Sequence, residues 1–89
     1  MLKKKSIKVP NGKLLTVLYD VQDNKIRFIQ VTGDFFMYPE EGIYTIERRL
    51  QGICMDRTQI RTVLQEVFLN EHIYLYGLTI DSIIDALFL

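Results

Sequence analysis

Hydrophobic and polar residues alternate along the first third of the chain, which is the pattern of half-buried strands. The clearest case is residues 13–21 (KLLTVLYDV). One face of this strand carries Leu15, Val17, Tyr19 and Val21. Residues 6–9 (SIKV) and 25–32 (KIRFIQVT) predict two further strands, and the turn sequences PNG at 10–12 and QDN at 22–24 separate the three. Because short turns join antiparallel neighbours, the pattern predicts a three-stranded meander.

From Gly33 onward, apolar residues recur at helical spacing instead. We predict a first helix that begins at Pro39 and ends near Gly52, a second that follows Asp56 and a third that follows Thr79. Their apolar faces are Ile43, Ile46 and Leu50 in the first, Ile60, Val63, Leu64, Val67 and Phe68 in the second, and Ile80, Ile83, Ile84 and Leu87 in the third. Asp56 and Gln59 have the spacing of a capping box.

Strands followed by helices favour an α+β fold, with the three helices packed on one face of the meander. The short segment 72–77 (HIYLYG) is predicted to be an extended connector. The other sheet face would carry Leu14, Thr16, Leu18 and Asp20 from the second strand. We expect this face to be too apolar for water, and an uncovered apolar face on a small domain indicates a partner.

The composition predicts one folded domain, 1–89, and limits the classes of partner. Of 89 residues, 48% are hydrophobic and 25% charged, and 11 basic residues balance 11 acidic ones. This balance gives no argument for binding to nucleic acid or membranes. The early lysines Lys3, Lys4, Lys5, Lys8 and Lys13 all precede the first acid. They are interpreted as a solvated, frayed start of the chain or as a patch that attracts an anion such as phosphate.

Residues with catalytic or metal-binding chemistry are few. Cys54 and His72 are the sole cysteine and histidine, so they form neither a disulfide nor a structural zinc site within the chain. Cys54 is predicted to be a buried, inert thiol and His72 a surface residue at a helix end. The pair Glu40 and Glu41 is interpreted as a complement to the positive end of a helix dipole. We predict no catalytic residue and no metal site.

A cytoplasmic location is the expectation from the lone cysteine and from the start of the chain. A signal peptide has an apolar core after its basic start, and no such core follows the basic residues here. No stretch approaches the about 18 apolar residues of a membrane span.

The segment 33–40 (GDFFMYPE) is the first candidate for a binding surface. Asp34 follows Gly33 where the strand should end, and it serves either as a turn residue or as a group that positions a partner or ligand. We expect one of Phe35 and Phe36 in the core and the other facing outward. Tyr38 would add an apolar body with a polar tip to the outward side.

The turn VPNGKL at 9–14 is the second candidate. Gly12 allows close approach of another molecule to the backbone, and Lys8 and Lys13 offer positive charge for an anion or nucleotide. A plain hairpin turn is the alternative.

These segments together resemble the C-terminal accessory domain of lipoate–protein ligases. The resemblance lies in Lys8, Pro10, Gly12, Lys13 and Leu14 of the first turn, in Gly33 to Glu40, in Leu50 and Gly52 at a helix end, and in the last helix GLTIDSIIDAL. It covers essentially the whole chain, and TGDFFMYPEE is its most specific part. The short chain resembles the split form, known in archaea, in which this domain is a separate small subunit.

The resemblance implies a non-catalytic subunit of a heterodimer. Such a ligase activates lipoate with ATP to lipoyl-AMP, then transfers the lipoyl group to a lysine of an acceptor domain. The complex would use ATP, Mg²⁺ and lipoate, whereas this chain alone would bind none of them and have no activity, since the catalytic domain's loops are absent from it. The implied fold resembles the iron–sulfur scaffold (SufE/NifU-like) proteins.

Two other functions stay open at this point. The chain could be a stand-alone sulfur or metal scaffold that uses Cys54, which would need more thiol ligands or an exposed reactive thiol. It could also be a plain structural or binding domain.

Overall fold

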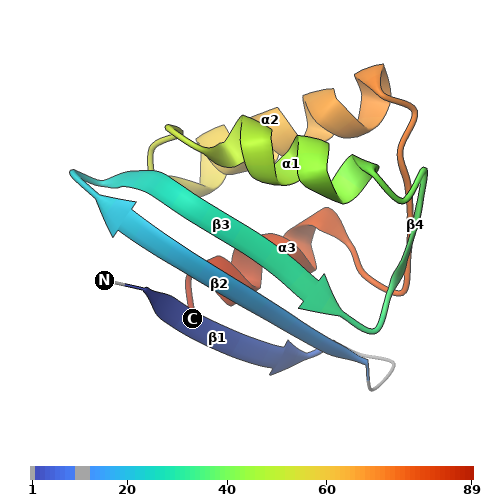
Figure 1. The fold of residues 1–89 in the computed structure, drawn as a ribbon, viewed down its shortest axis with the longest axis horizontal. Coiled ribbons are helices and arrows are strands. Elements are labelled where there is room, and N and C mark those ends of the chain that lie inside the picture. Colours follow the sequence, from blue (N-terminus) through green and yellow to red (C-terminus); the bar gives the residue numbers. More distant parts are fainter. Residues whose placement is uncertain (1, 10–12) are drawn as a thin grey trace.

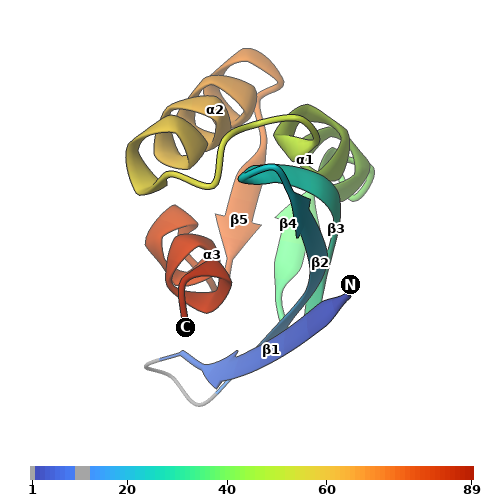
Figure 2. The same ribbon diagram turned by 90° about the vertical axis from the view of Figure 1, so that its left-hand side faces the viewer.

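The computed structural model describes residues 2–9 and 13–89. The elements follow in the order β1 (Lys3–Lys8), β2 (Leu14–Gln22), β3 (Lys25–Gly33), β4 (Phe36–Tyr38), α1 (Gly42–Leu50), α2 (Arg57–Asn70), β5 (Tyr74–Tyr76) and α3 (Ile80–Leu87). All the helices lie on one side of the sheet β1–β2–β3 (Figures 1 and 2). The predicted α+β class, antiparallel meander and three helices are therefore confirmed.

The meander is antiparallel with β2 in the centre. Asp23 and Asn24 join β2 to β3 with φ of 55° and 61°, the positive values that tight hairpin turns require. β1 begins at Lys3 rather than at residue 6, so Lys3 to Lys5 are strand residues and not a frayed start. Their backbone pairs with β2 from Tyr19 to Val17, and this pairing does not require apolar side chains. The predicted turn at 10–12 lies outside the described residues.

An irregularity between β2 and β3 sets which residues of β3 are buried. Asp20 pairs with Phe28 but Val21 pairs with Ile26, so Arg27 is an extra residue in β3. Such a bulge shifts the side-chain alternation by one position. Ile26 and Ile29 consequently both reach the core, although they are three residues apart.

The core lies between the sheet and the helices. α1 packs on β3, α3 packs on β1 and β2, and α2 packs across α1 and α3. The Tyr19 hydroxyl donates a buried hydrogen bond of 3.2 Å to the carbonyl of Leu87, which ties β2 to the end of α3. The fully buried residues include Leu15, Val17, Ile26, Ile29, Ile46, Leu50, Ile60, Leu64, Val67, Ile83, Ile84 and Leu87. The faces predicted for β2 and the three helices thus form this core.

Two of the predicted helix starts are confirmed. The Asp56 carboxylate accepts a hydrogen bond of 2.9 Å from the Gln59 amide, and the Thr79 hydroxyl accepts one of 3.1 Å from the Ser82 amide. The end of α1 is also confirmed, because Gly52 has a φ of +87° just after the helix.

The start of α1 is a correction. The helix begins at Gly42, three residues after the predicted Pro39. The preceding residues are extended, so the chain first turns through Pro39, Glu40 and Glu41, and the carbonyl of Pro39 accepts from the Gly42 amide at 3.0 Å. The two glutamates therefore lie just before the helix rather than in its first turn.

β4 and β5 form a second, two-stranded antiparallel sheet. β5 confirms the extended segment predicted within 72–77, whereas β4 was not predicted. In Figure 1, β4 stands at the right-hand end of the molecule, where it spans the gap between the sheet and the helices. The inner side of this ribbon packs closely on α1. A Cβ added to Gly42 would lie only 3.1 Å from the Met37 sulfur and 3.0 Å from the Ile73 Cδ1 atom.

Charged pairs join α2 to α3 on the surface. Arg57 contacts Asp85 at 3.2 Å and Arg61 contacts Asp81 at 2.6 Å, which matches two antiparallel neighbouring helices. The Arg57 guanidinium also lies 5.0 Å from the centre of the Phe88 ring. Among the described residues, no helix is long and apolar enough to cross a membrane.

Candidate functional site

The outer side of the β4–β5 ribbon carries a cluster of exposed aromatic side chains. Phe36 pairs with Tyr76, and Tyr38 pairs with Tyr74, so the four residues lie on one side of the ribbon. They are 76%, 61%, 70% and 57% exposed, respectively. Met37 and Leu75 point to the opposite side, where Met37 is buried and Leu75 half-buried. We call Phe36, Tyr38, Tyr74 and Tyr76 the aromatic face.

Strand alternation explains how the ribbon separates these side chains. In each of the sequences FMY and YLY, the middle residue faces inward and the two aromatic residues face outward. A two-stranded ribbon is at best marginally stable by itself in water. The packing of Met37 and Leu75 against the core therefore holds the ribbon, and the aromatic face is left free of that task.

The bend at the end of β3 leads the chain into this ribbon. Gly33 has a φ of +153°, and a Cβ there would lie 2.3 Å from the Leu14 carbonyl oxygen, so only glycine fits. The next amide, that of Asp34, donates a hydrogen bond of 2.9 Å to the same oxygen. The backbone of Asp34, rather than its carboxylate, thus holds the turn, and its side chain is exposed.

The two neighbouring phenylalanines are divided as predicted. Phe35 is half-buried and packs against the core, whereas Phe36 faces outward. Tyr38 shares the outward side, which is the expected position. The prediction missed Tyr74 and Tyr76 as members of the same surface. Their alternation in YLY was visible in the sequence, but it did not indicate which strand would pair with them.

The structure brings part of the second candidate to this bend. The Val9 amide donates to the Lys13 carbonyl at 2.9 Å and closes the β1–β2 loop. A Cβ at Gly77 would lie 3.2 Å from the Lys13 Cδ atom and 3.4 Å from the Asp34 carbonyl oxygen, so Lys13 lies beside both segments. Lys8 is exposed and paired with Leu14, and Gly12 lies outside the described residues.

A groove of about 430 Å³ adjoins the aromatic face. Its lining comes from the end of β3, the bend, β4 and the start of α1, and Phe36 belongs both to the groove and to the aromatic face. The lining residues are Val31, Thr32, Gly33, Phe35, Phe36, Met37, Glu40 and Ile43. Most of these contribute apolar atoms, so the groove suits an apolar side chain rather than a charged ligand.

Glu47 of α1 covers the edge of β3 beside this groove. Its carboxylate accepts a hydrogen bond of 2.8 Å from the Val31 amide, which otherwise would lack a partner at the sheet edge. Burial raises the pKa of Glu47 above its ordinary 4.5, and the hydrogen bond from Val31 opposes this shift in part.

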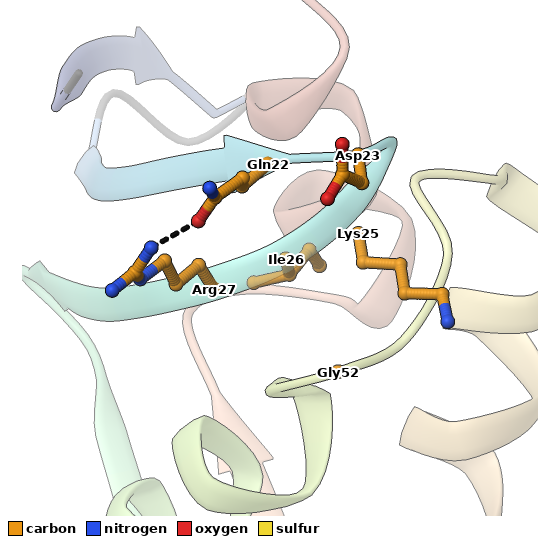
Figure 3. Close-up of a pocket in the computed structure, with 6 residues that line it drawn as sticks. All are labelled: Gln22, Asp23, Lys25, Ile26, Arg27 and Gly52. Carbon is orange, nitrogen blue, oxygen red and sulfur yellow. Dashed lines mark hydrogen bonds between the residues drawn. The ribbon is translucent and has the colours of Figure 1, made fainter.

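A second hollow, of about 560 Å³, lies at the turn between β2 and β3. Figure 3 shows that the charged ends of Lys25 and Arg27 point in opposite directions, and that Arg27 donates a hydrogen bond to the Gln22 side chain. An anion site would require the cations to converge on one point, and these two do not. This hollow offers no built site for a substrate.

The single cysteine and the single histidine are not members of the aromatic face. Cys54 is half-buried rather than buried, between Ile53 and Met55. His72 is exposed and follows the end of α2, as predicted. Within residues 2–9 and 13–89, no group of three or more His, Cys, Asp or Glu side chains is placed to hold a metal ion.

Comparisons with known proteins identify the family that this chain matches. A family model described as the bacterial lipoate protein ligase C-terminus matches residues 3–87. A relative from Thermoplasma acidophilum, lipoate-protein ligase A subunit 2, is 32% identical over 87 residues, which are 98% of this chain and 88% of the relative. The chain is also similar to a solved structure from Thermoplasma acidophilum. That structure comes from a study of an archaeal lipoylation system, which describes a bi-partite lipoate protein ligase and its E2 lipoyl domain. It is 30% identical, covers 98% of this chain and 94% of its own, and superposes with a TM-score of 0.83.

Proposed function

Because this chain belongs to the family of the lipoate protein ligase C-terminus, we propose that it is the accessory subunit of a two-subunit lipoate–protein ligase. The observation that carries this proposal is the match to a separate ligase subunit over nearly the full length of both chains. The shared fold, with a TM-score of 0.83 to a chain from a bi-partite ligase study, supports it.

The proposed complex activates lipoate with ATP to lipoyl-AMP and then transfers the lipoyl group to a lysine of an acceptor domain. The substrates of the complex would be ATP and lipoate, and its metal ion would be Mg²⁺. We assign the binding of all three to the catalytic subunit. The acceptor domain would accordingly be an indirect partner of this chain.

The role that fits such a subunit is positional. Docking on the catalytic subunit would order that subunit's loops over lipoate and ATP and keep water away from the acyl-adenylate. Lys13 lies beside Gly77 and the Asp34 backbone, so this cation stands at the bend. We assign Lys13 and Lys8, together with Gly12 of the same sequence segment, as the positions that would approach the triphosphate. A cytoplasmic location belongs to the same proposal, and the likeness to iron–sulfur scaffold proteins stays a prediction.

The test is to mix the purified chain with its catalytic subunit and to follow pyrophosphate release that depends on both lipoate and ATP. We expect neither protein alone to release pyrophosphate at the rate of the mixture, and the two to elute together from a sizing column. An unchanged rate together with separate elution would overturn the proposal. Lys13→Ala is expected to raise the KM for ATP in the mixture, whereas an unchanged KM would remove the lysine from the nucleotide site.

The scaffold alternative has no support from the geometry. A sulfur or metal scaffold needs several thiols or an exposed reactive one, and Cys54 is a lone, half-buried residue between apolar neighbours. Cys54→Ser should leave pyrophosphate release by the mixture unchanged. A loss of activity with an unchanged melting temperature would reopen this reading.

A further inference from the structure

We infer that the aromatic face is the surface with which this chain docks on the catalytic subunit; the inference rests on the proposed function. The face consists of two cross-strand pairs, Phe36 with Tyr76 and Tyr38 with Tyr74. All four side chains are more than half exposed in the chain by itself. Aromatic residues in such positions typically supply the central, energetically dominant contacts of protein interfaces.

The area of this face suits a protein partner. A buried aromatic side chain covers roughly 150–250 Å², so four that are more than half exposed offer on the order of 500 Å² of surface. A stable interface buries about 800 Å² on each partner, with a polar rim around an apolar centre. The aromatic face therefore supplies an interface centre of the required size, and the surrounding residues supply the remainder.

The four side chains are not part of the hydrophobic core of the chain. Met37 and Leu75, on the inner side of the ribbon, make the contacts with the core. Gly42 lets α1 approach so closely that an added Cβ would meet the Met37 sulfur at 3.1 Å. Because the ribbon is held from its inner side, the outer aromatic residues can be explained by binding rather than by packing.

The charges around the face indicate the chemistry of the partner. The segments 34–41 and 71–77, which contain the ribbon, include no lysine or arginine. Their acidic residues are Asp34, Glu40, Glu41 and Glu71, and all four are exposed. Lys13 lies at one end, beside Gly77. The complementary surface on the catalytic subunit is thus an apolar patch with a predominantly basic rim.

The groove beside the face adds a place for one anchoring side chain. Phe36 links the two surfaces, while Phe35 and Ile43 contribute apolar walls and Glu40 lies in the lining. Interface residues that dominate binding commonly fill such a pocket on the partner. We therefore expect the catalytic subunit to insert an aliphatic or aromatic side chain into this groove.

The decisive experiment measures the affinity of the catalytic subunit for the unaltered chain and for substituted chains. Tyr38→Ala and Tyr76→Ala, made singly, should each weaken binding by about 30-fold or more, the effect expected of a dominant interface residue. Phe28→Ala, on the outer face of the other sheet, is the matched aromatic control and should change affinity by less than about threefold. Melting temperatures show whether each variant is folded.

Hydrogen exchange of the unaltered complex tests the same surface without a substitution. Amides of residues 36–41 other than Pro39, and of residues 72–77, should be protected on binding, and those of the edge strand β1, residues 3–8, should not. This measurement decides the matter even where an aromatic substitution unfolds the ribbon.

The possible results separate the docking surface from the proposed function. If the unaltered chain does not bind the catalytic subunit, the proposed function fails and the docking surface fails with it. If the unaltered chain binds but the tyrosine variants bind equally well and the ribbon amides stay unprotected, only the docking surface is overturned. A dimer of this chain alone that Tyr38→Ala dissolves would assign the face to a second copy and would also overturn the inference.

Discussion

The chain has two sheet faces that its own helices leave uncovered, and they differ in how apolar residues are distributed. On the outer face of the meander, Leu14 and Phe28 are the large apolar side chains with substantial exposure, at 42% and 38%. They lie near opposite ends of the sheet, since Leu14 pairs with Lys8 and Phe28 with Asp20. On the aromatic face, four aromatic residues are neighbours on a short ribbon.

Cross-strand neighbours account for this difference. The apolar residues of β2 on the outer face alternate with Thr16 and Asp20, and they stand beside polar residues of both adjacent strands. Ser6 and Thr16 even form a side-chain hydrogen bond of 2.9 Å across the strands. The expectation that this face as a whole needs a partner, which came from β2 alone, is therefore too strong. An exposed apolar surface is defined by neighbouring strands together, not by one strand.

The bend that joins the two sheets offers the largest test. Gly33→Ala places a Cβ at about 2.3 Å from the Leu14 oxygen, so the backbone has to move. We expect a loss of about 2–4 kcal/mol in the free energy of unfolding, measured by urea denaturation. Gly52→Ala is the matched control, because its φ is also positive but nothing lies within 4 Å of the added atom. It should cost only about 1 kcal/mol, and equal losses would show that close contact at Gly33 does not matter.

Charge reversal compares the two faces directly through the rate of association with the catalytic subunit. Glu40→Lys alters the acidic surroundings of the aromatic face, and Lys4→Glu alters the outer face of the meander by a charge of equal size and opposite sign. If the aromatic face docks on a basic rim, Glu40→Lys should slow association by about tenfold at low salt, and added salt should reduce the difference. Stopped-flow mixing measures both rates. A larger effect from Lys4→Glu would move the interface to the meander.

The pH dependence of stability tests the contact at the β3 edge, where the Glu47 carboxylate accepts a hydrogen bond from the Val31 amide. Burial raises the pKa of Glu47 in the folded protein above its ordinary 4.5. The folded state thus holds this proton more tightly than the unfolded state does, so the stabilising contribution is present at low pH and is lost as the pH rises through the raised pKa. Glu47→Gln can still accept from the Val31 amide but does not titrate.

Relative to this variant, the unaltered chain should lose stability between pH 4 and pH 7. Thermal unfolding of both proteins at the two pH values gives the comparison, and other titrating groups cancel in the difference. A constant difference across this range would mean that Glu47 is not perturbed by burial.

The ion pairs between α2 and α3 provide the smallest expected effect and a baseline for the others. Arg61 and Asp81 are 2.6 Å apart, but their side chains are 41% and 68% exposed. Exposed pairs contribute little, because water screens the charges and both side chains lose freedom. Arg61→Gln should therefore change the free energy of unfolding by less than about 0.5 kcal/mol. A larger loss of unfolding free energy would show that the ion pair between α2 and α3 contributes more than an exposed pair usually does.

Local patterns were sufficient for the meander, the three helices, the caps at Asp56 and Thr79 and the expectation that one of Phe35 and Phe36 faces inward and the other outward; only the structure shows that Phe36 is the outward one. Each of these depends on residues that are close in the chain: alternation, helical spacing, or a side chain that bonds an amide three residues later. The family resemblance also rested on local motifs, and the match over residues 3–87 confirms it.

The tertiary structure alone decided the β4–β5 ribbon and, with it, the aromatic face. Three extended residues carry too little signal to predict a strand, and β4 exists because β5, far along the chain, supplies its hydrogen-bonding partners. α1 begins only at Gly42, after β4 and the turn that follows it. The exposure of Tyr74 and Tyr76 depends on which elements pack against them in space. Those neighbours are distant in the chain, so the order of the residues does not reveal them.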